Sequence, residues 1–108
     1  MSYRVKPSPE FQRRAKKLFK KYPSLPQDLR ALLTLLTTTP TIGDSLGRNC
    51  YKVRLGIESK GKGRSGGARV ITYVAVLAEE VVLLTIYDKV ERDNLRPGEL
   101  AELLKMLE

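Results

Sequence analysis

The sequence predicts a single α+β domain, in which a small antiparallel β-sheet is flanked by an N-terminal helical hairpin and a C-terminal helix. Three observations support this class: two neighbouring segments with apolar residues at helical spacing, three strand-like segments in the middle, and a short leucine-rich segment at the end. The expected order is β-α-α-β-β-β-α. A chain of 108 residues can bury one modest core, so residues 1–108 are expected to form one domain.

The N-terminal region predicts a short strand and a first helix. Residues 3–6 alternate between apolar and basic side chains and are followed by Pro7, which is typical of a short strand. Ser8 before Pro9 provides a helix cap and a first-turn proline. Residues 11–22 then repeat apolar side chains at helical spacing, with lysines and arginines on the opposite face.

A second helix follows closely. Ser24 and Gln27 have capping-box spacing, and leucines recur at helical spacing over residues 29–36 until Pro40 ends the segment. Because the link between the two helices is short, they are expected to pack as an antiparallel hairpin. Residues 41–47 are expected to form a loop.

Three strands and a final helix are expected in the second half of the chain. Residues 51–58 alternate strictly, which predicts a strand with one buried face and one cationic face. Residues 68–77 are rich in β-branched side chains, and residues 81–87 are almost wholly apolar, which is typical of a central strand covered on both faces. Residues 78–80 are expected to turn between them, and Pro97 opens the last helix.

Basic charge is concentrated on this predicted sheet. Residues 52–69 carry six Lys or Arg side chains against one Glu, and the loop of residues 59–67 holds four glycines. Residues 1–78 have a net charge of +12 and residues 79–108 a net charge of −4. Dense cations beside a loop whose backbone can present N–H groups indicate a surface for phosphates or nucleic acid. An ordinary solvated turn is the alternative interpretation.

The residue types that are absent restrict the chemistry. The chain has no histidine and one cysteine, Cys50, so an internal disulfide is excluded, and neither a metal site nor a cofactor is expected. Nucleophile pairs that need histidine are excluded, as is a ribonuclease that works through two histidines. No apolar segment is long enough to cross a bilayer and no secretion signal is recognised, so a cytoplasmic protein with no membrane partner is expected.

Several blocks of sequence together resemble one protein family. The run GKGRSGGARVITYV, the run VVLLTIYDKVERDNL and the leucine-rich helix after them are similar to the RelE/ParE superfamily of bacterial toxins. The RelE- and HigB-type branch shows a GKSGG-x-R-V-I-x-Y block, a strand ending I-Y-x-K and an acidic D-x-L before the last helix. The resemblance covers nearly the whole chain. This sequence departs from the family pattern at Val90, where Asn or Ser is common, and at Arg96, where a small polar helix cap is usual.

This resemblance implies a RelE-like fold and the activity of an mRNA interferase, the toxin of a type II toxin-antitoxin system. Such toxins enter the ribosomal A site, beside 16S rRNA, and cleave messenger RNA without a metal. The ribose 2′-OH attacks the adjacent phosphate and leaves a 2′,3′-cyclic phosphate and a 5′-OH. The resemblance also implies a cognate antitoxin, whose acidic segment is expected to cover the basic sheet face or displace the last helix.

Three residues are candidate catalytic groups. Arg69 aligns with the family's arginine after Gly-Gly, and its planar guanidinium can bind two phosphate oxygens; an ion pair with Glu58 is the structural alternative. Lys89 aligns with the I-Y-x-K lysine and is expected to act as acid, base or charged clamp. Tyr87 is expected to stack on a base or donate a hydrogen bond, unless it is a half-buried sheet residue. Neither Arg69 nor Lys89 is expected in the core.

A second set of residues is expected to bind RNA or the ribosome. Side chains on the cationic strand face and in the glycine-rich loop are expected to contact phosphates. A tyrosine on the Arg69 face of its strand is expected to reach the same site, unless it packs in the core. The set is Lys52, Arg54, Lys60, Lys62, Arg64 and Tyr73.

Two other functions stay open. A binding-only member of the superfamily, such as a ParE-like inhibitor of DNA gyrase or a catalytically inactive nucleic-acid-binding domain, would share the fold. A gyrase inhibitor does not need the cluster of Arg69, Tyr87 and Lys89, so this cluster favours the nuclease. A nucleic-acid-binding domain that is not a toxin is the remaining interpretation.

Overall fold

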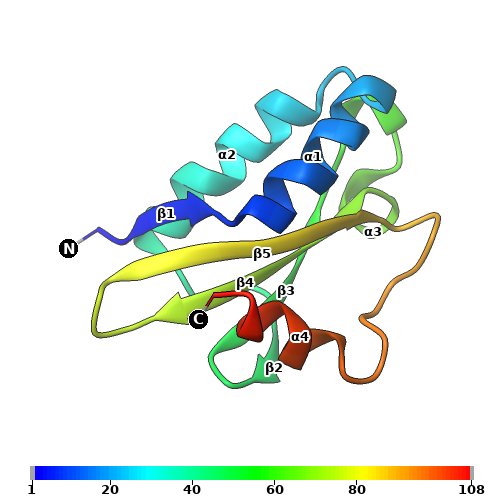
Figure 1. The fold of residues 1–108 in the computed structure, drawn as a ribbon. Coiled ribbons are helices and arrows are strands. Elements are labelled where there is room, and N and C mark those ends of the chain that lie inside the picture. Colours follow the sequence, from blue (N-terminus) through cyan, green and yellow to red (C-terminus); the bar gives the residue numbers. More distant parts are fainter. Residues whose placement is uncertain (1, 108) are drawn as a thin grey trace.

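The computed structural model describes residues 2–107, which form a five-stranded sheet with helices on both faces (Figure 1). The elements are, in chain order, β1 (Arg4–Pro7), α1 (Pro9–Lys21), α2 (Leu25–Thr38), β2 (Asp44–Gly47), β3 (Cys50–Leu55), the 3₁₀ turn η1 (Glu58–Lys60), α3 (Gly63–Gly66), β4 (Ala68–Ala75), β5 (Glu80–Asp88) and α4 (Glu99–Lys105). The strands lie in the order β1-β5-β4-β3-β2. The predicted α+β class and element order are confirmed, with β2 and the two short helical turns as additions.

Strand pairing follows the prediction in the centre of the sheet and departs from it at one edge. β3, β4 and β5 pair antiparallel, as expected. β1 instead lies parallel to β5, with Val5 opposite Val81. β5 therefore has a neighbour on each side, and every residue from Val81 to Asp88 is buried. This confirms the central strand predicted from its apolar sequence.

Residues 41–47, expected as a loop, contain the strand β2. This strand pairs antiparallel with β3, beginning with Asp44 opposite Lys52. The chain reverses at Arg48 and Asn49, whose φ angles are 57° and 61°. Tight hairpins favour positive φ at both central residues, which asparagine accepts readily, whereas an arginine gives no sequence signal for it. The residue types therefore gave little sign of this hairpin.

The two predicted helix caps have different outcomes. Ser8 Oγ accepts a hydrogen bond from Phe11 N (3.1 Å), which confirms the cap of α1. Ser24 makes no side-chain cap for α2. Its hydroxyl donates to Asp28 Oδ2 (2.8 Å) and accepts from Ser59 N (2.8 Å), so it ties the start of α2 to the glycine-rich loop instead.

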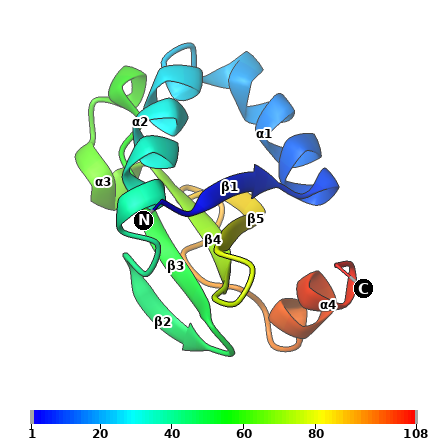
Figure 2. The same cartoon turned by 90° about the vertical axis from the view of Figure 1, so that its left-hand side faces the viewer.

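The sheet separates two hydrophobic cores. Helices α1 and α2 lie over one face, and α4 lies on the other side of the sheet (Figure 2). The larger core includes Phe11, Ala15, Leu29, Leu32, Leu36, Val53, Val70, Leu83 and Ile86, and the smaller includes Cys50, Ile71, Val82, Leu84, Tyr87 and Leu103. Helix α4 has only 7 residues and covers one part of its side of the sheet. The loop of residues 89–98 covers another part of the same side.

A β-bulge in β5 decides which side chains share the α4 face. The register of β4 against β5 shifts between Ile71 and Thr72, and Leu84 is left without a partner on β4. An extra residue in one strand reverses the in-and-out alternation beyond it. Tyr87 therefore lies opposite Arg69 on the α4 face, and the next residue points to the α1 side.

That next residue, Asp88, is a buried anchor of the fold. Its carboxylate accepts hydrogen bonds from Lys60 Nζ (2.8 Å), Tyr22 OH (2.5 Å) and Val90 N (3.0 Å). Lys60 Nζ also donates to Gly67 O (3.0 Å). The expectation of an exposed, RNA-binding Lys60 therefore needs correction: 6% of its side chain is exposed, and its ammonium group holds the glycine-rich loop against the sheet.

We expect Asp88 to make the stability of the fold depend on acidic pH. Burial by itself raises the pKa of Asp88, but the hydrogen bonds from Lys60 and Tyr22 outweigh it and lower the pKa from 3.8 to about 2. Because the pKa is lower in the folded state, the stabilisation is complete above about pH 4 and is lost as the pH falls toward about 2. The contribution is on the order of 2 kcal/mol.

Urea unfolding of the wild type and of Asp88→Asn at several pH values measures this contribution. The wild type should lose free energy of unfolding between about pH 5 and about pH 2 more steeply than the variant. Asp44→Asn, which removes an exposed carboxylate, is the matched control. Identical pH dependence in the wild type and Asp88→Asn would contradict the assignment.

Candidate functional site

The candidate site lies where β3, β4 and β5 bring three side chains onto the α4 face of the sheet. Arg54 is opposite Arg69 across β3 and β4, and Arg69 is opposite Tyr87 across β4 and β5. Side chains directly opposite each other on neighbouring strands lie about 5 Å apart at their Cβ atoms. The loop of residues 89–98 crosses this row and contacts it through Asp93.

Arg69 is buried at the centre of the row, with 1% of the residue exposed. Its Nη1 donates to the carbonyls of Arg64 and Ala68 (both 3.1 Å), and its Nη2 donates to the carbonyl of Ser65 (2.9 Å). The expectation that Arg69 lies outside the core is therefore wrong. The guanidinium is surrounded by backbone of the glycine-rich loop, and it fixes the conformation of that loop as well as its own.

Of the two glycines that precede Arg69, Gly67 is required on steric grounds. A Cβ atom on Gly67 would lie 2.0 Å from the carbonyl oxygen of Leu55, so only glycine lets these backbones approach so closely. This contact brings the end of the loop against the end of β3. The Gly-Gly-x-Arg pattern therefore places the Arg69 side chain as well as the strand that carries it.

Asp93 links the candidate residues to one another. Its Oδ1 lies 2.6 Å from Arg69 Nε and 4.0 Å from Lys52 Nζ, and its backbone oxygen accepts from Tyr87 OH (3.0 Å). The hydrogen bond from Arg69 lowers the pKa of Asp93, and the nearby charges of Lys52 and Lys89 act in the same direction. The carboxylate partner of Arg69 is thus Asp93, which the sequence interpretation did not single out. Its one signal was membership of the acidic D-x-L block.

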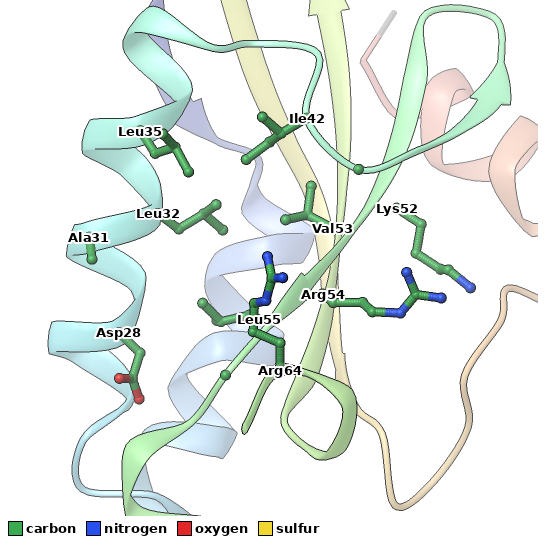
Figure 3. Close-up of a pocket in the computed structure, with 12 residues that line it drawn as sticks. Asp28, Ala31, Leu32, Leu35, Ile42, Lys52, Val53, Arg54, Leu55 and Arg64 are labelled. Atoms are coloured by element: carbon green, nitrogen blue, oxygen red, sulfur yellow. The ribbon is translucent and has the colours of Figure 1, made fainter. Parts of the chain in front are cut away.

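Lys52 and Arg54, expected together on an exposed cationic face, have different environments. Lys52 is 8% exposed, and its Nζ donates to Asn94 Oδ1 (2.8 Å) beneath the loop of residues 89–98. Arg54 stays exposed and pairs with Asp44 of β2 (3.1 Å). Both side chains extend from β3 away from α2 (Figure 3). The exposed face predicted for β3 is therefore correct for Arg54 and needs correction for Lys52.

Tyr87 is buried, with 3% of the residue exposed. It is thus more buried than the half-buried sheet residue given as the alternative to a functional role. The guanidinium carbon of Arg92 lies 4.3 Å from the centre of its ring, and Arg92 is itself held by Glu99 (2.5 and 2.9 Å). Burial raises the pKa of Tyr87 to about 12. Tyr87 therefore keeps its proton near neutral pH, and one face of its ring is covered by a cation.

Three further candidate cations lie on the glycine-rich loop or just after β5. Lys62 and Arg64 are exposed on the glycine-rich loop, and the half-buried Lys89 follows β5, with its backbone N donating to Gly67 O (3.1 Å). Arg64 also borders a hollow of about 460 Å³ between α2 and β3 (Figure 3). Arg64 therefore lies on the α2 side of β3, whereas Lys52 and Arg54 extend the other way (Figure 3).

Tyr73 is not part of the site. It shares the strand face of Arg69 but lies four residues farther along β4, a separation of about 13 Å. It borders a different hollow with Arg48 and Leu104, and it packs against the core under α4. The packing alternative given for Tyr73 fits this position.

The described residues give no metal centre and no membrane span. Within residues 2–107, no group of three or more His, Cys, Asp or Glu side chains is placed to bind a metal ion. Over the same residues, every helix is too short or too polar to cross a bilayer.

Comparison with known proteins supports the fold. No protein-family model matches the chain. A solved structure of the E. coli toxin RelE, a mutant in the free state, is similar with a TM-score of 0.59 and 18% sequence identity. The similarity covers 98% of this chain and 94% of that one. The chain therefore has a RelE-like fold.

We expect Arg69→Ala to destabilise the protein as well as alter the site. The substitution leaves three backbone carbonyls and Asp93 without their donor, which should lower the free energy of unfolding by about 2–3 kcal/mol. Chemical denaturation measures the change. Arg54→Ala, an exposed arginine one strand away, should change stability by less than about 0.5 kcal/mol. Equal stability of Arg69→Ala and the wild type would show that the buried network contributes little.

Proposed function

We propose that this chain is the toxin of a type II toxin-antitoxin system, a RelE- and HigB-type mRNA interferase that cleaves messenger RNA in the ribosomal A site. Residues 1–108 would act as one domain in the cytoplasm, without a metal or cofactor, and a cognate antitoxin would neutralise it. The RelE-like fold and the net charge of +8 support this proposal. The main observation in its favour is that the carboxylate of Asp93 binds Arg69 at the centre of the cationic site.

The carboxylate of Asp93 marks the proposed phosphate site. It lies 2.6 Å from Arg69 Nε and 4.0 Å from Lys52 Nζ. The other hydrogen bonds of Arg69 go to backbone carbonyls, so Asp93 is its exchangeable partner. A phosphate oxygen in the place of the carboxylate would meet the same two cations. Because the backbone already holds the guanidinium in position, Arg69 can stabilise new negative charge without rearranging.

The proposed reaction fits a protein without histidine. The RNA supplies the nucleophile: its 2′-OH gives up a proton and attacks the adjacent phosphorus, and the bond from phosphorus to the 5′ oxygen breaks while that oxygen takes up a proton. We assign Arg69 and Lys52 to the extra negative charge of the pentavalent intermediate, and Lys89 to proton transfer or charge neutralisation. Tyr87, with a pKa of about 12, would act as a hydrogen-bond donor that positions the loop or a base.

The exposed cations would hold the rest of the RNA. Arg54, which lies opposite Arg69, and the exposed loop residues Lys62 and Arg64 would contact phosphates of messenger RNA or of 16S rRNA. Lys60 has no place in this set, because Asp88 and a backbone carbonyl occupy its ammonium group.

One observation favours a second function. In this conformation Arg69 is hydrogen-bonded to Asp93, and the guanidinium of Arg92 covers the ring of Tyr87. A binding-only protein, such as a ParE-like inhibitor of DNA gyrase or an inactive nucleic-acid-binding domain, would not need these groups to be free. Expression of the chain, with translation and replication followed separately, decides between the two. Message cleaved on ribosomes supports the interferase, and blocked replication with intact message would exclude it.

We expect Lys89→Ala to lower ribosome-dependent cleavage by about a hundredfold, because it removes the cation that we assign to proton transfer. Cleavage of a defined message on purified ribosomes measures this change. Lys105→Ala makes the same change of charge on an exposed position of α4 and should leave cleavage unchanged. Equal activity of both variants would remove Lys89 from the mechanism.

We expect Asp93→Asn to bind inorganic phosphate about tenfold more tightly than the wild type, because the competing charge on Arg69 is gone. An NMR titration followed at the Arg69 Nε–H signal measures the affinity. Glu80→Gln, which instead frees Arg4 and Lys6 at the other end of β5, should leave that signal's titration unchanged. Equal or weaker phosphate binding by Asp93→Asn would contradict the assignment of this position as the phosphate site.

A further inference from the structure

Lys89, the residue assigned to proton transfer, lies where the backbone is held on both sides. Asp88 is the last residue of β5, and its end lies beside α3 and the glycine-rich loop (Figure 1). Lys89 N donates to Gly67 O (3.1 Å). The next peptide group, at Val90 N, donates to Asp88 Oδ1 (3.0 Å). The two peptide groups that flank the Lys89 Cα atom therefore each have a fixed acceptor.

One buried ammonium group connects these two acceptors. Lys60 Nζ donates to Gly67 O (3.0 Å), the oxygen that also accepts from Lys89 N. It donates as well to Asp88 Oδ1 (2.8 Å), the oxygen that accepts from Val90 N. Only 6% of the Lys60 side chain and 1% of the Asp88 side chain are exposed. This ion pair is too buried to bind RNA, so any effect on cleavage must pass through the residues that it holds.

Helix α1 holds the same carboxylate from its other side. Tyr22 OH donates to Asp88 Oδ2 (2.5 Å), and Lys21 Nζ lies 3.6 Å from that oxygen. The ammonium of Lys60 also lies 5.1 Å from the centre of the Tyr22 ring. Because both carboxylate oxygens have donors, the carboxylate cannot turn away from Val90 N without losing one of them.

The ammonium of Lys89 lies close to the proposed phosphate site. Its charge contributes to the lowered pKa of Asp93, the carboxylate that binds Arg69. A group that transfers a proton must come within hydrogen-bond reach of its partner, and a misplacement of about 1 Å can cost about a hundredfold in rate. Lysine is a long, flexible side chain, so a fixed backbone is needed to direct it.

We propose that Lys60 and Asp88 are positioning residues for Lys89, which fix its backbone so that its ammonium group reaches the scissile phosphate. Because it needs Lys89 to act on RNA, this role rests on the proposed function. Replacing a buried ion pair by apolar residues of similar size is often neutral for stability. Apolar side chains, however, could neither accept from Val90 N nor donate to Gly67 O.

Two substitutions of Asp88 separate positioning from stability. Asp88→Asn keeps an oxygen that can accept from Val90 N, and its amide group can donate to the hydroxyl of Tyr22, whereas Asp88→Ala keeps neither group. Both variants lose the charge that pairs with Lys60, so both should unfold at a lower urea concentration than the wild type.

Cleavage of a defined message on purified ribosomes should distinguish the two variants. The kcat of Asp88→Asn should stay within about threefold of the wild type, and that of Asp88→Ala should fall at least about twentyfold. The KM should change little in either variant, because the ion pair does not contact RNA. Leu36→Val, a core substitution in the last turn of α2, is the control for lost stability and should leave cleavage unchanged.

Amide hydrogen exchange at Val90 tests the same geometry without any cleavage. Relative to the amides of β4, exchange at Val90 should be as slow in Asp88→Asn as in the wild type and at least about tenfold faster in Asp88→Ala.

The outcomes separate this role from the function on which it rests. If the wild type leaves message intact on ribosomes, the proposed function fails and the positioning role fails with it. If the wild type cleaves but the two Asp88 variants cleave alike, only the positioning role is overturned. Equal loss of cleavage in Leu36→Val, or slow exchange at Val90 in Asp88→Ala, would overturn it as well.

Discussion

The guanidinium of Arg69 is the group around which this end of the molecule is organised. A charged side chain removed from water is costly unless hydrogen bonds and an opposite charge replace its hydration. Three carbonyls of residues 64–68 supply the hydrogen bonds, and Asp93 supplies the charge. Meeting this one requirement folds the glycine-rich loop back on its own strand and draws the loop of residues 89–98 across the sheet. The same requirement buries Lys52 beneath that second loop.

The end of β5 organises both faces of the sheet. Tyr87 joins the Arg69 network on one face, and Asp88 accepts from Lys60 and Tyr22 on the other. These adjacent residues point in opposite directions because of the alternation of a strand, and the bulge at Leu84 sets which of them faces which side. Two separate polar networks therefore hold the glycine-rich loop, one through Arg69 and one through Lys60.

The two faces of the sheet present different surfaces. On the α4 face, Arg69 and Lys52 are buried and paired, while Arg54 stays exposed beside them. On the opposite face, Lys16 and Arg30 border the apolar side chains between α1 and α2. The high net charge of the chain contributes to both surfaces, but packing decides which cations remain free to act.

Local sequence patterns determined the class of fold, both N-terminal helices, the three antiparallel strands and the final helix. Apolar periodicity is a property of each segment alone, so it could be recognised without the structure. The resemblance to the RelE/ParE superfamily singled out Arg69, Lys89 and Tyr87 as candidates, and the structure places Arg69 and Tyr87 opposite each other. The local patterns did not reveal β2, since positive φ at Arg48 follows from the pairing of β2 with β3 and not from the residue type.

Tertiary structure alone decided what each charge does. Lys52, Lys60 and Arg69 look equivalent to Lys62 and Arg64 in sequence, yet the first three are buried and paired while the last two are exposed. The difference comes from carboxylates and carbonyls that lie far away along the chain and close in space. Burial and pairing are relations between segments, so the sequence specified which cations exist and only the packed fold determined which of them are available.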